Sequence, residues 1–189
     1  MLYSFLTDMW DILRLRYKNP ADYFYTLPVI LAILLLLGMI NAADMSTLLG
    51  VSTAAVVFGV LVTAIKWLIL SRVMRHVLSG NGAPRLPLWG FILASEALMI
   101  PALLVFYVPQ ITPLLMFWKT WAFWAQAVGL MKMGQVKVWT VFKGYLLYFC
   151  CMVLIIGILI QLFTLAGWFD KATLMQNFNA LTAAMEQAR

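Results

Sequence analysis

Charged side chains are scarce in this sequence. Only 11% of its 189 residues are Asp, Glu, Lys or Arg, 65% are hydrophobic, and the mean hydropathy is +0.95. About a quarter of the residues of an ordinary soluble domain are charged. A water-soluble fold of this size also leaves too much of its chain at the surface to hide so many apolar side chains. The composition therefore predicts an integral membrane protein.

Residues that commonly carry catalysis or bind metals are also few. The chain has one histidine, His76, together with seven acids and two cysteines. These cannot supply a Ser–His–Asp set, paired catalytic acids or metal-ligand spacing, and one histidine cannot ligate a bis-histidine haem. Cys150 and Cys151 are neighbours in an apolar run, where they would point about 100° apart on a helix, so no disulfide is expected. We predict that the protein is not an enzyme and binds no metal or cofactor.

Long, unbroken apolar runs are what the sequence does contain. Two examples are VILAILLLLGMI at residues 29–40 and LLYFCCMVLIIGILIQLF at residues 146–163. In lipid every backbone donor and acceptor needs an internal partner, which leaves helices or a closed barrel. Barrel strands alternate apolar and polar side chains over about ten residues, and these runs do not. The predicted fold class is therefore all-α.

Five apolar segments predict about five transmembrane helices, since one crossing needs about 20 residues at 1.5 Å each. Three domains follow: an amphipathic interfacial helix at residues 1–19, a five-span membrane domain at 20–167, and an amphipathic tail at 168–189. The stretch SRVMRHVLSGNGAPRLP, residues 71–87, is predicted to be the one substantial loop because of its glycines and prolines. The expected spans are residues 23–40, 53–70, 88–108, 113–131 and 144–165.

Basic residues mark alternate sides of these spans. The first and third loops hold no Lys or Arg, so the positive-inside rule predicts a cytoplasmic N-terminus and a C-terminus on the opposite side. Short loops suit a bacterial inner membrane. The net charge of +6 is split over three short segments, so no nucleic-acid partner is expected. The three basic segments contain Arg14, Arg16 and Lys18, then Arg72, Arg75 and Arg85, and finally Lys132, Lys137 and Lys143.

Both ends of the chain show amphipathic patterns. At the N-terminus polar and apolar side chains recur on opposite helical faces, and Trp10 lies on the apolar face. This pattern predicts a helix in the headgroup plane or one docked on the protein's own spans, and both can hold together. In the tail, apolar side chains recur on one helical face, which predicts a second helix that lies on the membrane surface or docks on the protein. The polar N-terminal positions are Ser4, Thr7, Asp8, Asp11, Arg14 and Lys18. The apolar tail positions are Leu174, Phe178, Leu181 and Met185.

Three charged residues, Lys66, Glu96 and Lys119, fall inside predicted spans. A charge at membrane depth costs at least about 2.5–3.5 kcal/mol, so each needs a partner, water or an escape route. A short turn joins the third and fourth spans, and folding it brings Glu96 level with Phe123 and about one turn from Lys119. We expect a Glu96–Lys119 pair with Lys66 as second partner. This intramembrane polar site either handles an ion, proton or lipid headgroup or fixes the register of two helices.

The basic residues around the second loop suggest contact with lipid. His76 follows Arg72 and Arg75, and Arg85 lies farther along the same stretch. These side chains are predicted to face headgroups, where an arginine-rich cytoplasmic edge can hold anionic lipid.

The fourth and fifth expected spans carry a recognisable pattern. Tryptophan-rich FWKTWAFWAQ, residues 117–126, leads into AVGLMKMGQVKVWTVFKG, residues 127–144, and then a long apolar span. With an amphipathic N-terminus and five spans, residues 20–165 resemble the Yip family of small five-span membrane proteins. Gly129 and Leu130 match the short Gly-Leu connection of that family, flanked by Lys137 and Lys143, whereas Gly-Gln-Val after Met133 departs from the serine-containing segment expected there. The resemblance implies a non-enzymatic protein that organises or binds other membrane components.

Three functions fit these observations. The leading one is a non-catalytic interaction or scaffold protein, or an accessory subunit of a membrane complex, whose partners are other membrane subunits or further copies of itself. The second is a small carrier or channel-like protein that uses Glu96, Lys119 and Lys66; the absence of a visible inverted repeat counts against it. The third is a lipid-binding membrane protein.

Overall fold

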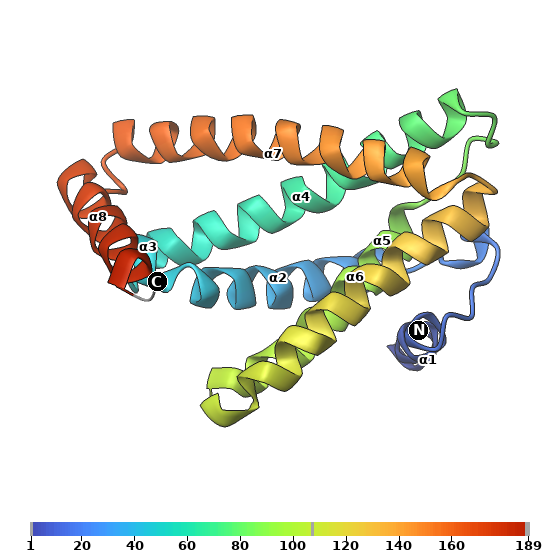
Figure 1. The fold of residues 1–189 in the computed structure, drawn as a ribbon, viewed down its shortest axis with the longest axis horizontal. Helices are drawn as coiled ribbons and strands as arrows, with labels where there is room; N and C mark the ends of the chain where they lie inside the picture. Colours follow the sequence, from blue (N-terminus) through green and yellow to red (C-terminus); the bar gives the residue numbers. More distant parts are fainter. Residues whose placement is uncertain (1, 107, 188–189) are drawn as a thin grey trace.

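The computed structural model describes residues 2–106 and 108–187, and every regular element in that part of the chain is helical (Figure 1). The N-terminal helix α1 is followed by two groups of longer helices and a C-terminal helix α8. In chain order the elements are α1 Leu2–Leu13, η1 Pro20–Asp22, α2 Leu27–Asp44, α3 Ser46–Leu49, α4 Thr53–Gly80, α5 Trp89–Glu96, η2 Ala97–Phe106, η3 Pro109–Ile111, α6 Thr112–Gly134, α7 Val138–Leu165 and α8 Lys171–Gln187.

Three of the helices in the described residues, α2, α4 and α7, are long and apolar enough to cross a membrane. They run along the long axis of the molecule, and an oblique hairpin of α5, η2 and α6 lies beside them (Figure 1). The first arm of the hairpin contains a shorter apolar helix, Trp89–Leu104. The chain is therefore all-helical, with helices compatible with an integral membrane protein.

Helix α4 is longer than expected, and the predicted loop at residues 71–87 is wrong over its first ten positions. The helix continues to Gly80 because the stretch contains no breaker before that glycine, and it buries Ser71, Met74 and Leu78 against neighbouring helices. The consequence is that Lys66 lies in the middle of a 28-residue helix and not near its end.

Small residues let α2 and α4 approach closely. A Cβ added at Gly38 would lie 2.5 Å from the Cα of Val60, and one added at Gly59 would lie 2.8 Å from the Cβ of Ala42. Asn41 donates a hydrogen bond to Thr63 across the same contact at 2.7 Å. Small residues with a polar cross-link are the usual means of helix association in membranes, where burial of apolar surface drives little.

The first arm of the hairpin changes from α-helix to 3-10 helix immediately after Glu96. Pro101 lies within the 3-10 segment and cannot donate the i→i−3 hydrogen bond that the carbonyl of Leu98 would receive in a 3-10 helix. The indole Nε1 of Trp118, on the opposite arm, donates to that carbonyl at 2.6 Å. The two arms are thus tied together where the helix is irregular.

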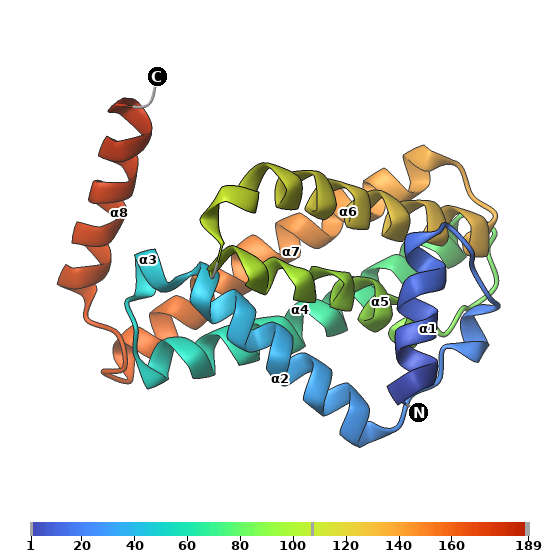
Figure 2. The ribbon, with the colours of Figure 1, turned by 90° about the horizontal axis from the view of Figure 1, so that it is seen from below.

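Helix α1 packs crosswise against α5 and α6 at one end of the bundle (Figure 2). Asp8, expected on the polar outer face, is instead only 2% exposed; it forms an ion pair with Lys18 and accepts a hydrogen bond from Tyr25. The hydrogen bond with Asp8 raises the pKa of Lys18 above its ordinary value. Trp10 remains exposed and carries the guanidinium of Arg14 over its ring, 4.6 Å from the centroid.

The opposite end of the bundle carries α3 and α8 (Figures 1 and 2). Asp170 caps α8 by accepting hydrogen bonds from Thr173, and Asn177 donates to the carbonyl of Leu48 in α3. Leu174 and Phe178 line a hollow between α8, α3 and α7, whereas the side chains of Leu181 and Met185 lie outside the described residues. We refer to the two ends of the bundle as the α1 end and the α8 end.

Candidate functional site

A polar cavity of about 240 Å³ lies where α2, α4, the hairpin's first arm and α6 converge. It contains all three residues expected to form a polar site, Lys66, Glu96 and Lys119, and adds Asp44 from the end of α2. The remaining lining residues are Leu37, Ile40, Asn41, Ser95, Met99, Ala102, Ala122, Phe123 and Gln126. We call this space the polar cavity.

The inner part of the polar cavity holds an ion pair between Lys66 of α4 and Glu96 of α5. Their side chains are 27% and 14% exposed, respectively. Lys66 reaches Glu96 because it projects from the middle of α4 at the level where α5 ends. The pair therefore lies about 20 Å along α4 from either of its ends, at 1.5 Å per residue.

A second pair lies nearer the α8 end. The Nζ of Lys119 is 3.7 Å from the Oδ2 of Asp44, and both side chains are almost half exposed. Glu96 and Lys119 share the polar cavity as expected, and Lys66, the expected second partner, does pair with Glu96. The expected Glu96–Lys119 pair is wrong, because Lys119 pairs with Asp44 instead. The reason is geometric: α2 ends beside α6, so the carboxylate nearest to Lys119 comes from Asp44.

Neutral polar groups beside the inner pair link α5 to α6 and α7. Gln126 donates to the hydroxyl of Ser95 at 2.9 Å and accepts from the hydroxyl of Tyr145 at 2.7 Å. Ser95 in turn donates to the carbonyl of Ile92 at 2.9 Å. This chain fixes the orientation of Gln126, so that the wall of the polar cavity is held by hydrogen bonds from three helices.

Sequence reasoning missed Asp44, Ser95 and Gln126. The spacing of Lys119 and Gln126, seven residues apart and hence on one helical face, was the available signal for Gln126. Asp44 carried no such signal because it was expected in a loop.

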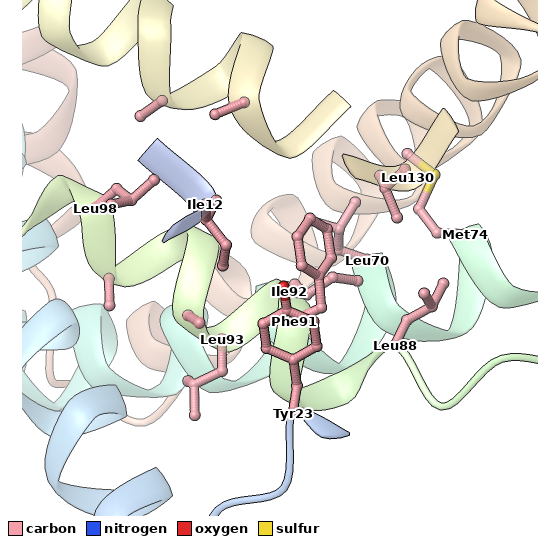
Figure 3. Packing of buried hydrophobic residues seen from close by; sticks show 14 of the residues in the cluster. Ile12, Tyr23, Leu70, Met74, Leu88, Phe91, Ile92, Leu93, Leu98 and Leu130 are labelled. Carbon is pink, nitrogen blue, oxygen red and sulfur yellow. The ribbon is translucent and has the colours of Figure 1, made fainter. Parts of the chain in front are cut away.

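An apolar layer, whose side chains Figure 3 shows, lies between the polar cavity and the α1 end. It begins about one turn, and ends about two turns, beyond Lys66, Glu96 and Gln126 along the chain, and its members are at most 1% exposed. The polar cavity is consequently closed toward the α1 end, whereas exposure rises toward Asp44 and Lys119. The layer consists of Leu70 and Met74 from α4, Leu88, Phe91 and Ile92 from the start of the hairpin, and Leu130 from α6.

The residues expected to face lipid headgroups lie at the α1 end. Arg72, Arg75 and His76 are exposed on the last turns of α4, and Arg85 is exposed in the connection that follows. They do not take part in the polar cavity. Within residues 2–106 and 108–187, no three His, Cys, Asp or Glu side chains are grouped so as to hold a metal ion.

Comparisons of the chain with protein-family models, with curated proteins and with solved structures gave no match.

Proposed function

We propose that the chain is an integral membrane protein that crosses the bilayer five times, through α2, α4, the Trp89–Leu104 helix, α6 and α7. The three segments rich in basic residues lie at the α1 end in both views (Figures 1 and 2). This supports a cytoplasmic α1 end and an α8 end on the opposite side, in a bacterial inner membrane. Alkaline phosphatase fused after residue 189 should be active and the same enzyme inserted at residue 82 inactive; the reverse result would contradict this orientation.

We propose further that the protein binds a small polar ligand in the polar cavity, reached from the α8 end, and does so without catalysis. The observation that carries this is that four charged side chains from four helical segments line one space. Ionisable groups at membrane depth are costly and commonly mark ligand or ion sites. Exposure of Lys119 and Asp44, with closure beyond Lys66 and Glu96, supports access from one side.

A purely structural role would require the Lys66–Glu96 pair to be dry. Buried ion pairs often add little net stability compared with apolar residues of similar size. In the polar cavity the inner pair shares its space with a second pair and with Ser95 and Gln126. This favours a ligand site over an ion pair that only fixes the register of two helices.

Water access distinguishes the two roles. After Cys150 and Cys151 are changed to Ala, Met99→Cys in the cavity wall should react with a membrane-impermeant thiol reagent added from the α8 side. Ala97→Cys, on the same helix but 0% exposed in the apolar core, is the matched control and should stay unreacted. Failure of Met99→Cys to react in folded protein would refute the ligand-binding role and favour a structural pair.

A second function, that of an accessory subunit or homo-oligomer, is favoured by the surface of α7. Only Val141, Gly144 and Met152 of its 28 residues are buried, while Phe149 and Leu154 are more than 60% exposed. Such a face suits contact with lipid or with another transmembrane helix. The resemblance to the Yip family, which implies a protein that binds other membrane components, agrees with this function. Purification in native nanodiscs with mass spectrometry tests this: stoichiometric membrane subunits or a homo-oligomer support it, and a monomer with lipid alone contradicts it.

A further inference from the structure

We infer that the polar cavity takes a small zwitterion that carries a primary ammonium group at one end and a carboxylate or phosphate group at the other. The inference rests on the proposed ligand-binding function and adds the chemical class of the ligand. It follows from the charge balance, the donor and acceptor types, and the size and position of the cavity.

The charged side chains of the polar cavity sum to zero. Asp44 and Glu96 contribute two negative charges, and Lys66 and Lys119 contribute two positive charges. A single ion entering such a site would leave one uncompensated charge in a medium of low dielectric constant, which costs several kcal/mol. A zwitterion adds no net charge.

The two ion pairs offer matching partners for both ends of such a ligand. Each charged group comes from a different helical segment, so a ligand can insert between the partners and replace one pair by two. Its ammonium group would then donate to the carboxylate of Glu96 or Asp44, while its anionic group accepts from Lys66 or Lys119. This exchange of ion pairs transfers no proton and forms or breaks no covalent bond.

The lining favours a primary ammonium group over a quaternary one. Quaternary ammonium ions are recognised by several aromatic faces, and among the described residues that line the polar cavity Phe123 alone is aromatic. Carboxylates, by contrast, accept hydrogen bonds, which a primary ammonium group can donate and a quaternary one, having no N–H, cannot. Ser95 and Gln126 add neutral polar contacts.

The size and position of the polar cavity leave two sources for this chemistry. Its 240 Å³ equals the volume of about eight water molecules, which suits a head group or a small amino acid. Asp44 and Lys119, which line the cavity, are almost half exposed, so this side of the cavity can admit either a dissolved zwitterion or the ethanolamine head group of a phospholipid.

The experiment uses the full chain in nanodiscs and probes of defined charge. Free glycerophosphoethanolamine, a net-neutral phosphodiester, and alanine are compared with glycerophosphocholine, ethanolamine and inorganic phosphate for protection of Met99→Cys from the thiol reagent. In a second arm, nanodiscs made from equal phosphatidylethanolamine and phosphatidylcholine are extracted, and the lipid retained by the protein is quantified by mass spectrometry.

Protection by glycerophosphoethanolamine or alanine alone among the free probes would support the inference with a dissolved ligand. Selective retention of phosphatidylethanolamine, lost on Glu96→Gln, would support it with a lipid ligand. Glu96→Gln should weaken binding at least tenfold, whereas Asp22→Asn, the same change at an exposed site outside the cavity, should leave it unchanged. The protection arm keeps all four charges, so it remains decisive even where Glu96→Gln does not fold.

Other outcomes overturn the inference. Equal protection by ethanolamine or phosphate would mean that the site takes an ion. Protection by glycerophosphocholine equal to that by glycerophosphoethanolamine would contradict the need for a primary ammonium group. Reactive Met99→Cys with no protection by any probe and no lipid selectivity would also reject the zwitterion. In each case the reactivity of Met99→Cys leaves the proposed function standing, whereas an unreactive Met99→Cys rejects both.

Discussion

The contact between α2 and α4 makes a graded prediction about glycine substitutions. Gly38→Ala places a Cβ 2.5 Å from the Cα of Val60, and ordinary carbon–carbon contacts need about 3.5–4.0 Å. Because a backbone atom cannot turn aside, the two helices must separate locally by about 1 Å. Overpacking of this kind costs about 1–3 kcal/mol. The separation also strains the hydrogen bond from Asn41 to Thr63.

Two other helical glycines serve as comparisons. The Cβ of Gly144→Ala would lie 2.6 Å from the Sδ of Met74, a flexible side chain that can move, whereas that of Gly157→Ala meets nothing within 4 Å. The exposed change should be neutral or stabilising by about 0.5–1 kcal/mol, since alanine loses less backbone entropy than glycine in a helix. We therefore expect Gly157→Ala to be the most stable of the three variants, Gly144→Ala to be intermediate and Gly38→Ala to be the least stable.

Tryptophan fluorescence during thermal unfolding in one detergent measures this order. A chain of this length shifts its midpoint by about 2–4 °C per kcal/mol, so a cost of about 1–3 kcal/mol should lower the midpoint of Gly38→Ala by roughly 2–12 °C relative to wild type. Gly157→Ala should leave the midpoint unchanged or raise it slightly. A Gly38→Ala variant as stable as Gly157→Ala would refute the close α2–α4 contact.

Three further predictions concern the helix ends and the hairpin. Asp8 raises the pKa of Lys18 above 10.5, so the stability that wild type gains over Lys18→Met in fluorescence-monitored unfolding should persist below pH 10.5 and vanish as pH rises through the raised pKa. Hydrogen bonds from the hydroxyl and backbone N–H groups of Thr173 lower the pKa of Asp170 below 3.8. The protection factors of α8 amides in hydrogen exchange, which are corrected for the intrinsic pH dependence, should therefore fall as pH falls through that lowered pKa, but not in Asp170→Asn, which caps at every pH. Trp118→Phe removes the hydrogen bond to the carbonyl of Leu98 and should lower the free energy of unfolding by about 1–3 kcal/mol. In the same urea titration the control Trp124→Phe, at a half-exposed site, should lower it by only a few tenths of a kcal/mol.

The closeness of Glu96 and Lys119 was predictable because it depends on features that a sequence encodes locally. Apolar runs indicated the helices, and the short connection between α5–η2 and α6 fixed which residues of the two arms lie level. The 1.5 Å rise per residue then brought Glu96 close to Lys119. That reasoning extends no farther than one hairpin.

The choice of ion-pair partners depends on how separate helices lie beside one another, which hydropathy does not encode. Asp44 reaches Lys119 because close glycine contacts bring α2 against α4, and because the hairpin then leans past the end of α2. The burial of Asp8 has a similar cause: its neighbours Lys18 and Tyr25 come from the segment that follows α1, and a helical-wheel pattern contains no information about that return. In both cases the sequence pattern did not show which separate segments pack beside each other.

The apolar layer decides what kind of binding the polar cavity can support in this conformation. A pathway through the molecule would have to expose Leu70, Met74, Leu88, Phe91 and Leu130 to water. At about 1.5–3 kcal/mol for each large apolar side chain, the total is on the order of 10 kcal/mol, far above thermal energy. The 3-10 segment around Pro101 offers a place for the hairpin to bend, but it lies on the α8 side of Glu96, so bending there widens the mouth and leaves the layer closed. The proposed zwitterion would therefore enter and leave through the α8 end alone, which favours a one-sided binding site over a channel.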